Sequence, residues 1–145
     1  MHPWAEAVIN DRLDLKETAA ALEVGCPHFA GIFALGAALA LFEKIGPRHI
    51  EERIHELTDY LHQRLDQQGL HVASPRHREQ RSGITIVEMC NAPDVVKHLA
   101  EKKIIVSARG KGLRVSVHIF NNFDDIDRLI IGLRELTSMT RANTE

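Results

Sequence analysis

The chain has 145 residues, which is enough for one domain with a hydrophobic core of its own. Its hydrophobic fraction of 44% and charged fraction of 26% are ordinary for a globular domain, and its net charge of -2 excludes a global basic field that would draw it to nucleic acid or anionic membranes. No apolar run approaches the ~20 residues that cross a bilayer, and the first residues lack a signal-peptide pattern, so a cytoplasmic location is expected.

The first 24 residues show no sustained hydrophobic period, and we interpret them as a connecting segment. A turn at residues 25–28 then precedes an apolar run over residues 29–45 that is rich in small side chains. This run is too apolar on all sides for a surface helix, so it predicts a helix that is buried on most sides. Gly31 and Gly36 each cost a helix about 1 kcal/mol relative to Ala, which suggests that another backbone approaches closely there.

A second, amphipathic helix is predicted over residues 48–68, because Gly46 and Pro47 supply a stop followed by a start and Gly69 supplies the next stop. Its apolar residues recur at three- and four-residue spacing and form one stripe: Ile50, Ile54, Leu57, Leu61 and Leu65. A short strand over residues 70–73 and a polar loop over residues 74–82 are expected to follow. Three arginines in that loop are interpreted as solvated, because no aromatic residue lies between them.

The remaining chain alternates short strands with helices. Strands are predicted over residues 84–89, 103–108 and 113–120, with a tight turn at residues 109–112 and a short helix that opens at Asn91. The inner side of that short helix is expected to carry its apolar residues, Val95, Val96 and Leu99.

The last helix is expected to begin after Asn122, which can cap it, with Asp124 and Asp125 near the positive end of the helix dipole. Its apolar residues should face the core: Ile126, Leu129, Ile130, Leu133 and Leu136. The whole order predicts an α+β fold, a small and mostly antiparallel sheet with helices packed on one face.

We divide the chain into three parts on this basis. Residues 1–24 are a linker or the remnant of a connection to another domain, residues 25–136 form the domain, and residues 137–145 form a tail. The sequence shows no internal repeat.

The predicted strand at residues 113–120 carries the most informative polar side chains. Alternation places Arg114, Ser116 and His118 on the face opposite the apolar residues. A guanidinium fork suits bidentate binding of a carboxylate or a phosphate. From the residues alone, an ordinary exposed strand face explains this pattern at least as well.

Other chemistry has weaker support. The turn at residues 25–28 precedes a helix and could offer backbone amides to a phosphate, although a tight turn explains it equally well. The two cysteines, Cys26 and Cys90, form no CxxC pair, so we expect two buried or half-buried thiols rather than a disulfide or a nucleophile. The nine histidines include no HExxH motif, and no metal site is predicted.

Four segments, in this order, resemble motifs of the class V aminotransferases, which include cysteine desulfurases, selenocysteine lyases, kynureninases and isopenicillin-N-epimerase-like enzymes. Residues 23–32, EVGCPHFAGI, resemble the turn and helix E-x-G-T-P-N-x-x-G-I, and residues 45–50 resemble the x-G-x-x-x-I junction that follows. Residues 81–84 match R-S-G-I. Residues 114–129 are similar to R-x-S-x-H-x-Y-N-T-x-x-D-I-D-R-L. The resemblance covers roughly residues 15–136 and implies the C-terminal small domain of a fold-type I enzyme that depends on pyridoxal phosphate (PLP).

The resemblance assigns substrate binding to the last strand. In the family, the arginine at the position of Arg114 binds the carboxylate of the amino-acid substrate. His118 and Asn121 match neighbouring motif positions and are expected to join it. The family's tyrosine is Phe120 in this chain, so its hydroxyl is lost.

The resemblance assigns cofactor-phosphate binding to the first turn. Gly25, Cys26 and His28 match the family's G-T-P-N positions, whose threonine helps to hold the PLP phosphate in the neighbouring subunit of a dimer. Cys26 lacks that hydroxyl, and His28 replaces the asparagine, so the backbone at Gly25 and the start of the helix would have to serve.

The family's Schiff-base lysine belongs to the large domain, upstream of this turn. Lys16 is the one lysine among the first 24 residues, and its surroundings do not match the family's lysine motif. We therefore expect that the chain forms no aldimine with PLP, carries no catalytic residue and is inactive alone. The loop at residues 107–113 contains no cysteine, which disfavours a parent enzyme that transfers sulfur.

Three interpretations remain open at this stage. The chain could be the small domain of a PLP enzyme that works with a separate large-domain chain or as a homo-oligomer. It could be a non-catalytic module that dimerises through the apolar helix at residues 29–45. It could be a small domain that binds carboxylates through Arg114.

Overall fold

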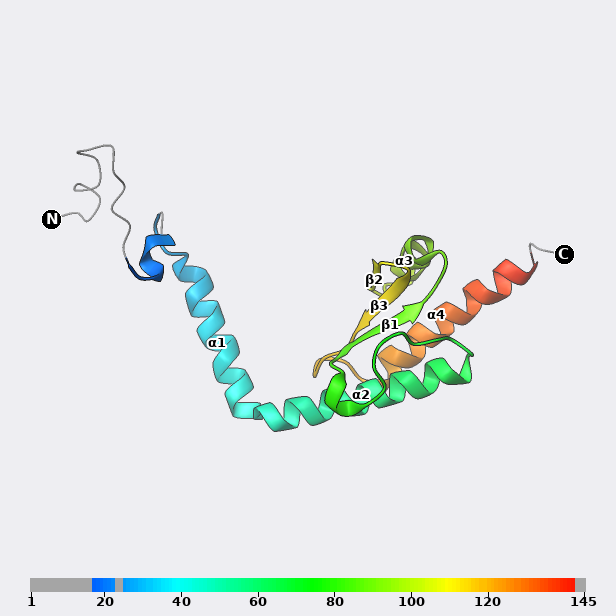
Figure 1. Cartoon of the computed structure of the whole chain (residues 1–145), viewed down its shortest axis with the longest axis horizontal. Coiled ribbons are helices and arrows are strands. Elements are labelled where there is room, and N and C mark those ends of the chain that lie inside the picture. Colours follow the sequence, from blue (N-terminus) through cyan, green and yellow to red (C-terminus); the bar gives the residue numbers. More distant parts are fainter. Residues whose placement is uncertain (1–16, 23–24, 143–145) are drawn as a thin grey trace. The chain divides into compact units, whose positions relative to one another are not determined.

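The computed structural model describes residues 17–22 and 25–142, with side chains to residue 136. The chain divides after Leu41 into two compact units. Figure 1 shows the helices and strands in chain order: the 3-10 turn η1 (Ala19–Leu22), α1 (Phe29–Ile45), α2 (Pro47–Gln67), the 3-10 turn η2 (Arg78–Gln80), β1 (Ile84–Glu88), α3 (Ala92–Glu101), β2 (Ser107–Arg109), β3 (Gly112–Ser116) and α4 (Phe123–Ala142). Most of the linker predicted at residues 1–24 lies outside the described residues.

The second unit has the predicted α+β architecture. Its three strands form an antiparallel sheet in the order β1-β3-β2, so β3 is central. A tight turn joins β2 to β3, and Gly110 adopts a left-handed φ of 56° there, which glycine accepts without strain. The fold class predicted from the sequence is confirmed.

The core lies between one face of the sheet and helices α2, α3 and α4. Leu57, Leu61 and Leu65 of the α2 stripe are fully buried, whereas Ile50 and Ile54 nearer the helix start are half-buried. The other helices and the sheet contribute the remaining buried apolar residues: Val72, Val87, Leu99, Leu113, Val115, Val117, Ile126, Leu129, Ile130 and Leu133. Burying each large aliphatic side chain contributes about 1.5–3 kcal/mol, so these predicted stripes hold the unit together.

Three predicted strands are shorter than expected. The segment at residues 70–73 forms a single bridge between Val72 and Val87. The strand expected from residue 103 begins only at Ser107, because the Ile104 amide donates to the Leu99 carbonyl (2.9 Å) and ties this segment to the end of α3.

The strand expected to reach residue 120 ends at Ser116. Beyond it, the His118 amide donates to the Asn121 side chain (2.9 Å) and the Asn121 amide donates to the His118 carbonyl (2.9 Å). These two bonds turn the chain toward α4. The ends of the predicted strands were therefore wrong where local hydrogen bonds replaced the ladder.

The predicted cap of α4 is confirmed. Asn122 Oδ1 accepts a hydrogen bond from the Asp125 amide (2.9 Å), and Asp125 Oδ2 accepts one from the Asn122 amide (3.2 Å). This reciprocal pair satisfies two amides that a helix start leaves open. The helix continues past residue 136 to Ala142, and residues 143–145 lie outside the described part of the chain.

The prediction that the first helix is buried was wrong for this chain. None of the residues of α1 is buried, and its large apolar side chains are exposed: Phe29, Ile32, Phe33, Leu35, Leu39 and Leu41. Gly31 meets the ring of His28 rather than another backbone, and a Cβ at Gly36 would meet nothing within 4 Å. Apolar composition indicates that burial of a helix would be favourable, but it does not show which part of a protein buries it.

In the described part of the chain, no single helix is long and apolar enough to cross a membrane. The helices α1 and α2 meet that test only when counted together, as a bent pair, by length and composition.

Candidate functional site

The face of the sheet that points away from the core carries the predicted substrate-binding arginine. Arg114 lies in the central strand, and the register pairs it with Ile86 of β1 and Ser107 of β2. Its neighbours along the strand, Leu113 and Val115, are buried in the core on the opposite face. Alternation along a strand therefore directs Arg114 outward, as the sequence predicts.

Arg114 has no carboxylate partner among the described residues. Its guanidinium belongs to a half-buried side chain, and its Nε is buried without a hydrogen-bond acceptor. Arginine stays charged at any pH that proteins tolerate, and a partly buried charge without a counterion is costly. An anion that reached this face would recover that cost.

Three other guanidinium or hydroxyl groups share this face. Ser116 lies two residues along β3 and is exposed, and Ser107 lies directly across from Arg114. Arg109 follows Ser107 by two residues on β2 and pairs with Gly112, which has no side chain. The face thus carries two arginines and two hydroxyls, a set of donors that suits an anion.

The predicted His118 lies just beyond the end of β3. Its ring stacks on Phe120, with 5.4 Å between ring centroids, and lies 6.0 Å from the ring of Phe42 at the end of α1. Its Nδ1 is buried and has no hydrogen-bond partner among the described residues. The structure therefore holds His118 by its ring faces and leaves a ring nitrogen available.

The predicted Asn121 is engaged in shaping the chain. Its Oδ1 accepts from the His118 amide, and its Nδ2 donates to Asp125 Oδ2 (3.3 Å). These bonds link the end of β3 to the start of α4. The structure brings Arg114, His118 and Asn121 to one strand and the turn that follows it, and the contacts of Asn121 are those of a residue that positions its neighbours.

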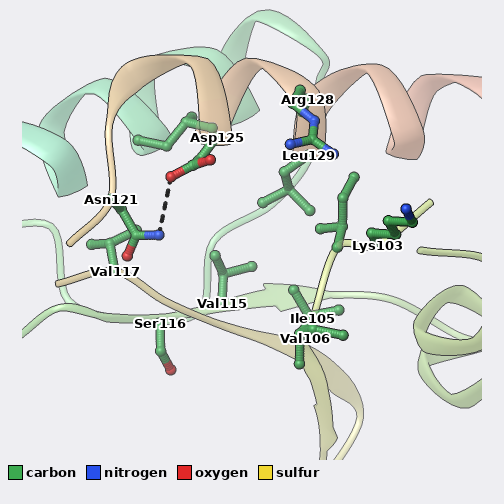
Figure 2. Close-up of a pocket in the computed structure, with 12 residues that line it drawn as sticks. Lys103, Ile105, Val106, Val115, Ser116, Val117, Asn121, Asp125, Arg128 and Leu129 are labelled. Atoms are coloured by element: carbon green, nitrogen blue, oxygen red, sulfur yellow. Dashed lines mark hydrogen bonds between the residues drawn. The ribbon is translucent and has the colours of Figure 1, made fainter. Parts of the chain in front are cut away.

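A cavity of about 230 Å³ lies between the residue 103–106 segment, the end of β3 and α4. Figure 2 shows its polar side chains at the rim, with Asn121 and Asp125 at one end and Lys103 and Arg128 at the other. Arg114 does not line this cavity. No sequence pattern predicts this cavity, because its lining joins residues 103–106, β3 and α4, which are apart in sequence.

The predicted phosphate-binding turn belongs to the first unit. Gly25, Cys26 and His28 are exposed, and a Cβ at Gly25 would meet nothing within 4 Å. The His28 carbonyl accepts from the Ile32 amide (3.0 Å), which starts α1. The geometry is that of an open helix start, and the phosphate role stays a prediction.

Both cysteines are exposed, so the expectation of buried or half-buried thiols was wrong. Cys26 lies in the turn before α1 and Cys90 lies in the turn after β1, and neither takes part in a disulfide. Among the residues that the structure describes, no three His, Cys, Asp or Glu side chains come together in a way that could hold a metal ion.

Two arginines of the loop at residues 74–82, Arg76 and Arg78, are exposed as the sequence suggested, but all three arginines bind carboxylates and Arg81 is nearly buried. Arg81 and Arg78 both bind Asp59, and Arg76 binds Asp66 with two hydrogen bonds of 2.7 and 2.9 Å. The Arg81 side chain is only 4% exposed. Asp59 and Asp66 lie seven residues apart, two turns along α2, and give this loop the carboxylates that the prediction overlooked.

The charges of this loop affect the acids that hold it. Burial acts to raise the pKa of Asp59, but the hydrogen bonds from Arg81 and Arg78 outweigh it, and the pKa is lowered. The hydrogen bonds from Arg76 likewise lower the pKa of Asp66. Both aspartates therefore stay ionised well into the acidic range.

Comparisons with known proteins agree on one family. The family model described as aminotransferase class-V matches residues 4–129. The chain is 32% identical over 136 residues to a kynureninase from Shouchella clausii. This match covers 85% of the chain and 31% of the kynureninase. It is 33% identical over 136 residues to a probable cysteine desulfurase from Halalkalibacterium halodurans, and this match covers 83% of the chain and 33% of the desulfurase.

A solved structure shows the same fold. The apo structure of a cysteine desulfurase from Thermococcus onnurineus matches with a TM-score of 0.77 at 23% sequence identity. The match covers 90% of this chain and 36% of the desulfurase chain. The chain thus spans about a third of the length of the relatives that it matches.

Proposed function

Because the chain belongs to the PLP-dependent class V aminotransferase family, we propose that it acts as the C-terminal small domain of such an enzyme and binds the carboxylate of an amino-acid substrate. Arg114 is the group that binds it. A planar fork on a strand holds a carboxylate through two parallel hydrogen bonds, which fixes both the position and the orientation of the substrate.

The single observation that carries this proposal is the missing counterion of Arg114. Five other described arginines bind a carboxylate: Arg53, Arg64, Arg76, Arg78 and Arg81. Arg114 is half-buried and binds none. A partly buried cation without a partner does not stabilise the fold, so we attribute Arg114 to binding an external anion.

The residues described here fit only part of a PLP site. The start of α1 presents the open amides that a phosphate prefers, but the strand residues around Arg114 include no lysine. When bound, PLP supplies an electron sink for chemistry at the substrate's α-carbon. This chain's own contribution is to bind and orient the carboxylate.

The remaining two thirds of the family's length would supply the rest of the site, either from the same polypeptide or from a separate large-domain chain. The exposed apolar side chains of α1 support such a partner, since a surface of this kind gains from being covered. Dimer contacts, a role for Gly25, Cys26 and His28 at the cofactor phosphate and a cytoplasmic location complete the proposal.

A second candidate function rests on α1 alone. Its large exposed side chains, with Phe33 at 76% exposure, are also what a non-catalytic dimerising module would present. In that case the chain would self-associate through α1, and Arg114 would have no ligand. Sedimentation equilibrium combined with the binding test below separates the two functions.

Calorimetry on this chain tests the carboxylate site. L-Alanine should bind the wild type, whereas isopropylamine, which lacks the carboxylate, should not. Arg114→Gln should lower the affinity for L-alanine at least tenfold, because a charge-assisted bidentate contact is lost. Arg48→Gln, at an exposed arginine of α2 outside the sheet, serves as the matched control. Equal binding of L-alanine by the wild type and Arg114→Gln would remove Arg114 from the site.

A further inference from the structure

Three arginines bind the segment at residues 76–83 to α2, and Arg81 is the one whose side chain is nearly buried, at 4% exposure. The Arg81 guanidinium binds Asp59, donates to the Arg76 carbonyl (3.1 Å) and lies 3.5 Å from His62 Nδ1. All three partners come from α2 or from the segment itself. We refer to Arg81, Asp59, His62 and Thr85 as the clip.

His62 occupies the inner end of the clip. It is 5% exposed, and its Nε2 lies 3.1 Å from the hydroxyl oxygen of Thr85, which is fully buried in β1. A guanidinium can only donate hydrogen bonds, so the Nδ1 that faces Arg81 is the acceptor nitrogen. Nε2 then carries the proton and donates to Thr85, and the clip is complete with a neutral imidazole.

A backbone hydrogen bond connects the segment that carries Arg81 to the end of β3. Gly83, two residues after Arg81, accepts a hydrogen bond from the Val117 amide (2.8 Å). A Cβ on Gly83 would lie 2.4 Å from the Val117 carbonyl oxygen, so the two backbones are in close contact. The residue after Val117 is His118, one of the candidate site residues.

We propose that Arg81 is a positioning residue for the end of β3 and that protonation of His62 releases it. An imidazolium carries a proton on both ring nitrogens. Its Nδ1–H would point at the Arg81 guanidinium, so an acceptor would be replaced by a second cation. Arg81 and the backbone at Gly83 would then become mobile. The hydrogen bond from the Val117 amide to the Gly83 carbonyl would weaken, and the positions of Val117 and His118 would no longer be fixed by it.

The charges around His62 come from two elements. The residue 76–83 segment contributes Arg76 and Arg81, and α2 contributes Asp59 and Asp66. Strand β1 contributes only the neutral Thr85. The two aspartates already bind the loop's arginines, so they offset the cations only in part.

The direction of the pH effect follows from this setting. Burial first, and then Arg76 and Arg81, lower the pKa of His62 below its ordinary value of 6.5. With a folded-state pKa below the unfolded one, the unfolded or released state binds more protons between those two values. The clip is therefore at full strength above about pH 6.5 and weakens as the pH falls below it, until His62 is protonated in the folded state as well.

Release of Arg81 by protonated His62 is a property of the folded chain and does not depend on whether Arg114 binds a carboxylate.

Amide exchange of the Val117 N–H, followed by NMR at pH 7.5 and 5.5 and corrected for intrinsic rates, tests the proposal. Protection of Val117 should fall up to about tenfold more than that of the Leu61 amide in the middle of α2, because the pH lies one unit below the free histidine value. His62→Gln should abolish this difference, and His77→Gln, an exposed histidine of the same loop, should retain it. Equal losses at Val117 and Leu61, or an unchanged difference in His62→Gln, would overturn the proposal.

A titration of the wild type keeps the proposal testable if His62→Gln does not fold. The His62 ring resonances should titrate with a midpoint below pH 6.5, and the amides of Gly83 and Val117 should shift with the same midpoint. A midpoint at or above 6.5, or amides that do not follow it, would show that His62 does not control the clip.

Discussion

Two arginines of the second unit, Arg81 and Arg114, differ in the partners of their guanidinium groups. Arg81 is nearly buried and binds a carboxylate, a carbonyl and a histidine. Arg114 is half-buried, lies at the centre of the sheet and has no acid beside it. The chain supplies a carboxylate to Arg81 and none to Arg114 among the described residues, and our proposal assigns Arg114 to an external ligand. That difference separates an arginine that holds the fold from one that is available to a ligand.

The largest expected difference in the free energy of unfolding is between the variants that remove Arg81 and Arg114. Arg81→Met should lower the free energy of unfolding by about 1–2 kcal/mol, because the half-exposed Asp59 and the buried His62 each lose a partner. Arg114→Met should leave it within about 0.5 kcal/mol of the wild type or raise it slightly, because no partner is lost. Urea unfolding of the two variants at pH 7.5 measures both values. Equal losses would show that Arg114 is structural.

The next effect concerns the acid that holds the clip. Asp59→Asn should lower the free energy of unfolding by about 1–2 kcal/mol at pH 7, since two arginines lose a charged acceptor. The pKa of Asp59 is lowered in the folded state, so its contribution is present above the unfolded value of 3.8 and is lost as the pH falls through the folded value.

Unfolding midpoints measured from pH 6 to pH 2 check this dependence. The wild type should lose more stability across the acid range than Asp59→Asn does. Asp94→Asn, at an exposed acid paired only with Lys97, should follow the wild type. A slope that is unchanged in Asp59→Asn would mean that the clip does not depend on this carboxylate.

A smaller effect is expected at the turn that ends β3. Asn121→Ala removes the acceptor of the His118 amide and the donor to Asp125, and should lower the free energy of unfolding by about 1 kcal/mol. The clip at Arg81 does not include Asn121, so the His62 titration should be unchanged. A shifted His62 midpoint in this variant would show that the two ends of β3 are coupled more widely than proposed.

A last effect, of similar size, is expected at Thr85. Thr85→Val keeps the shape of the side chain but removes the acceptor of the His62 Nε2–H, and should lower the free energy of unfolding by about 0.5–1.5 kcal/mol. Thermal unfolding followed by circular dichroism measures it. Thr58→Val, which removes a buried hydroxyl bonded to its own helix, is the matched control.

The sequence predicted what depends on local periodicity. The apolar stripes of α2 and α4, the cap at Asn122 and the outward direction of Arg114 all follow from spacing along one element. The fold class followed from the order of those elements, and the family resemblance agreed with it.

The sequence could not predict features that join distant segments. The end of β3 and the start of β2 are set by bonds to side chains or to α3, which no strand pattern encodes. The pairing of Arg81 with Asp59 joins residues 22 positions apart, so the sequence pattern could not show that this arginine of an otherwise exposed loop is nearly buried. The cover of α1 is absent from the described residues, so its apolar composition alone predicted a burial that this chain does not show.

NMR observation of the arginine Nε–H groups tests the central claim most directly, because Arg81 and Arg114 then report in the same spectrum. Addition of L-alanine should shift the Arg114 Nε–H resonance in a saturable way and leave that of Arg81 in place, since Arg81 is bound to Asp59 whereas Arg114 has no acid beside it. Isopropylamine should move neither. Equal shifts at both arginines, or no shift at Arg114 at saturating L-alanine, would contradict the assignment of Arg114 as the carboxylate-binding residue.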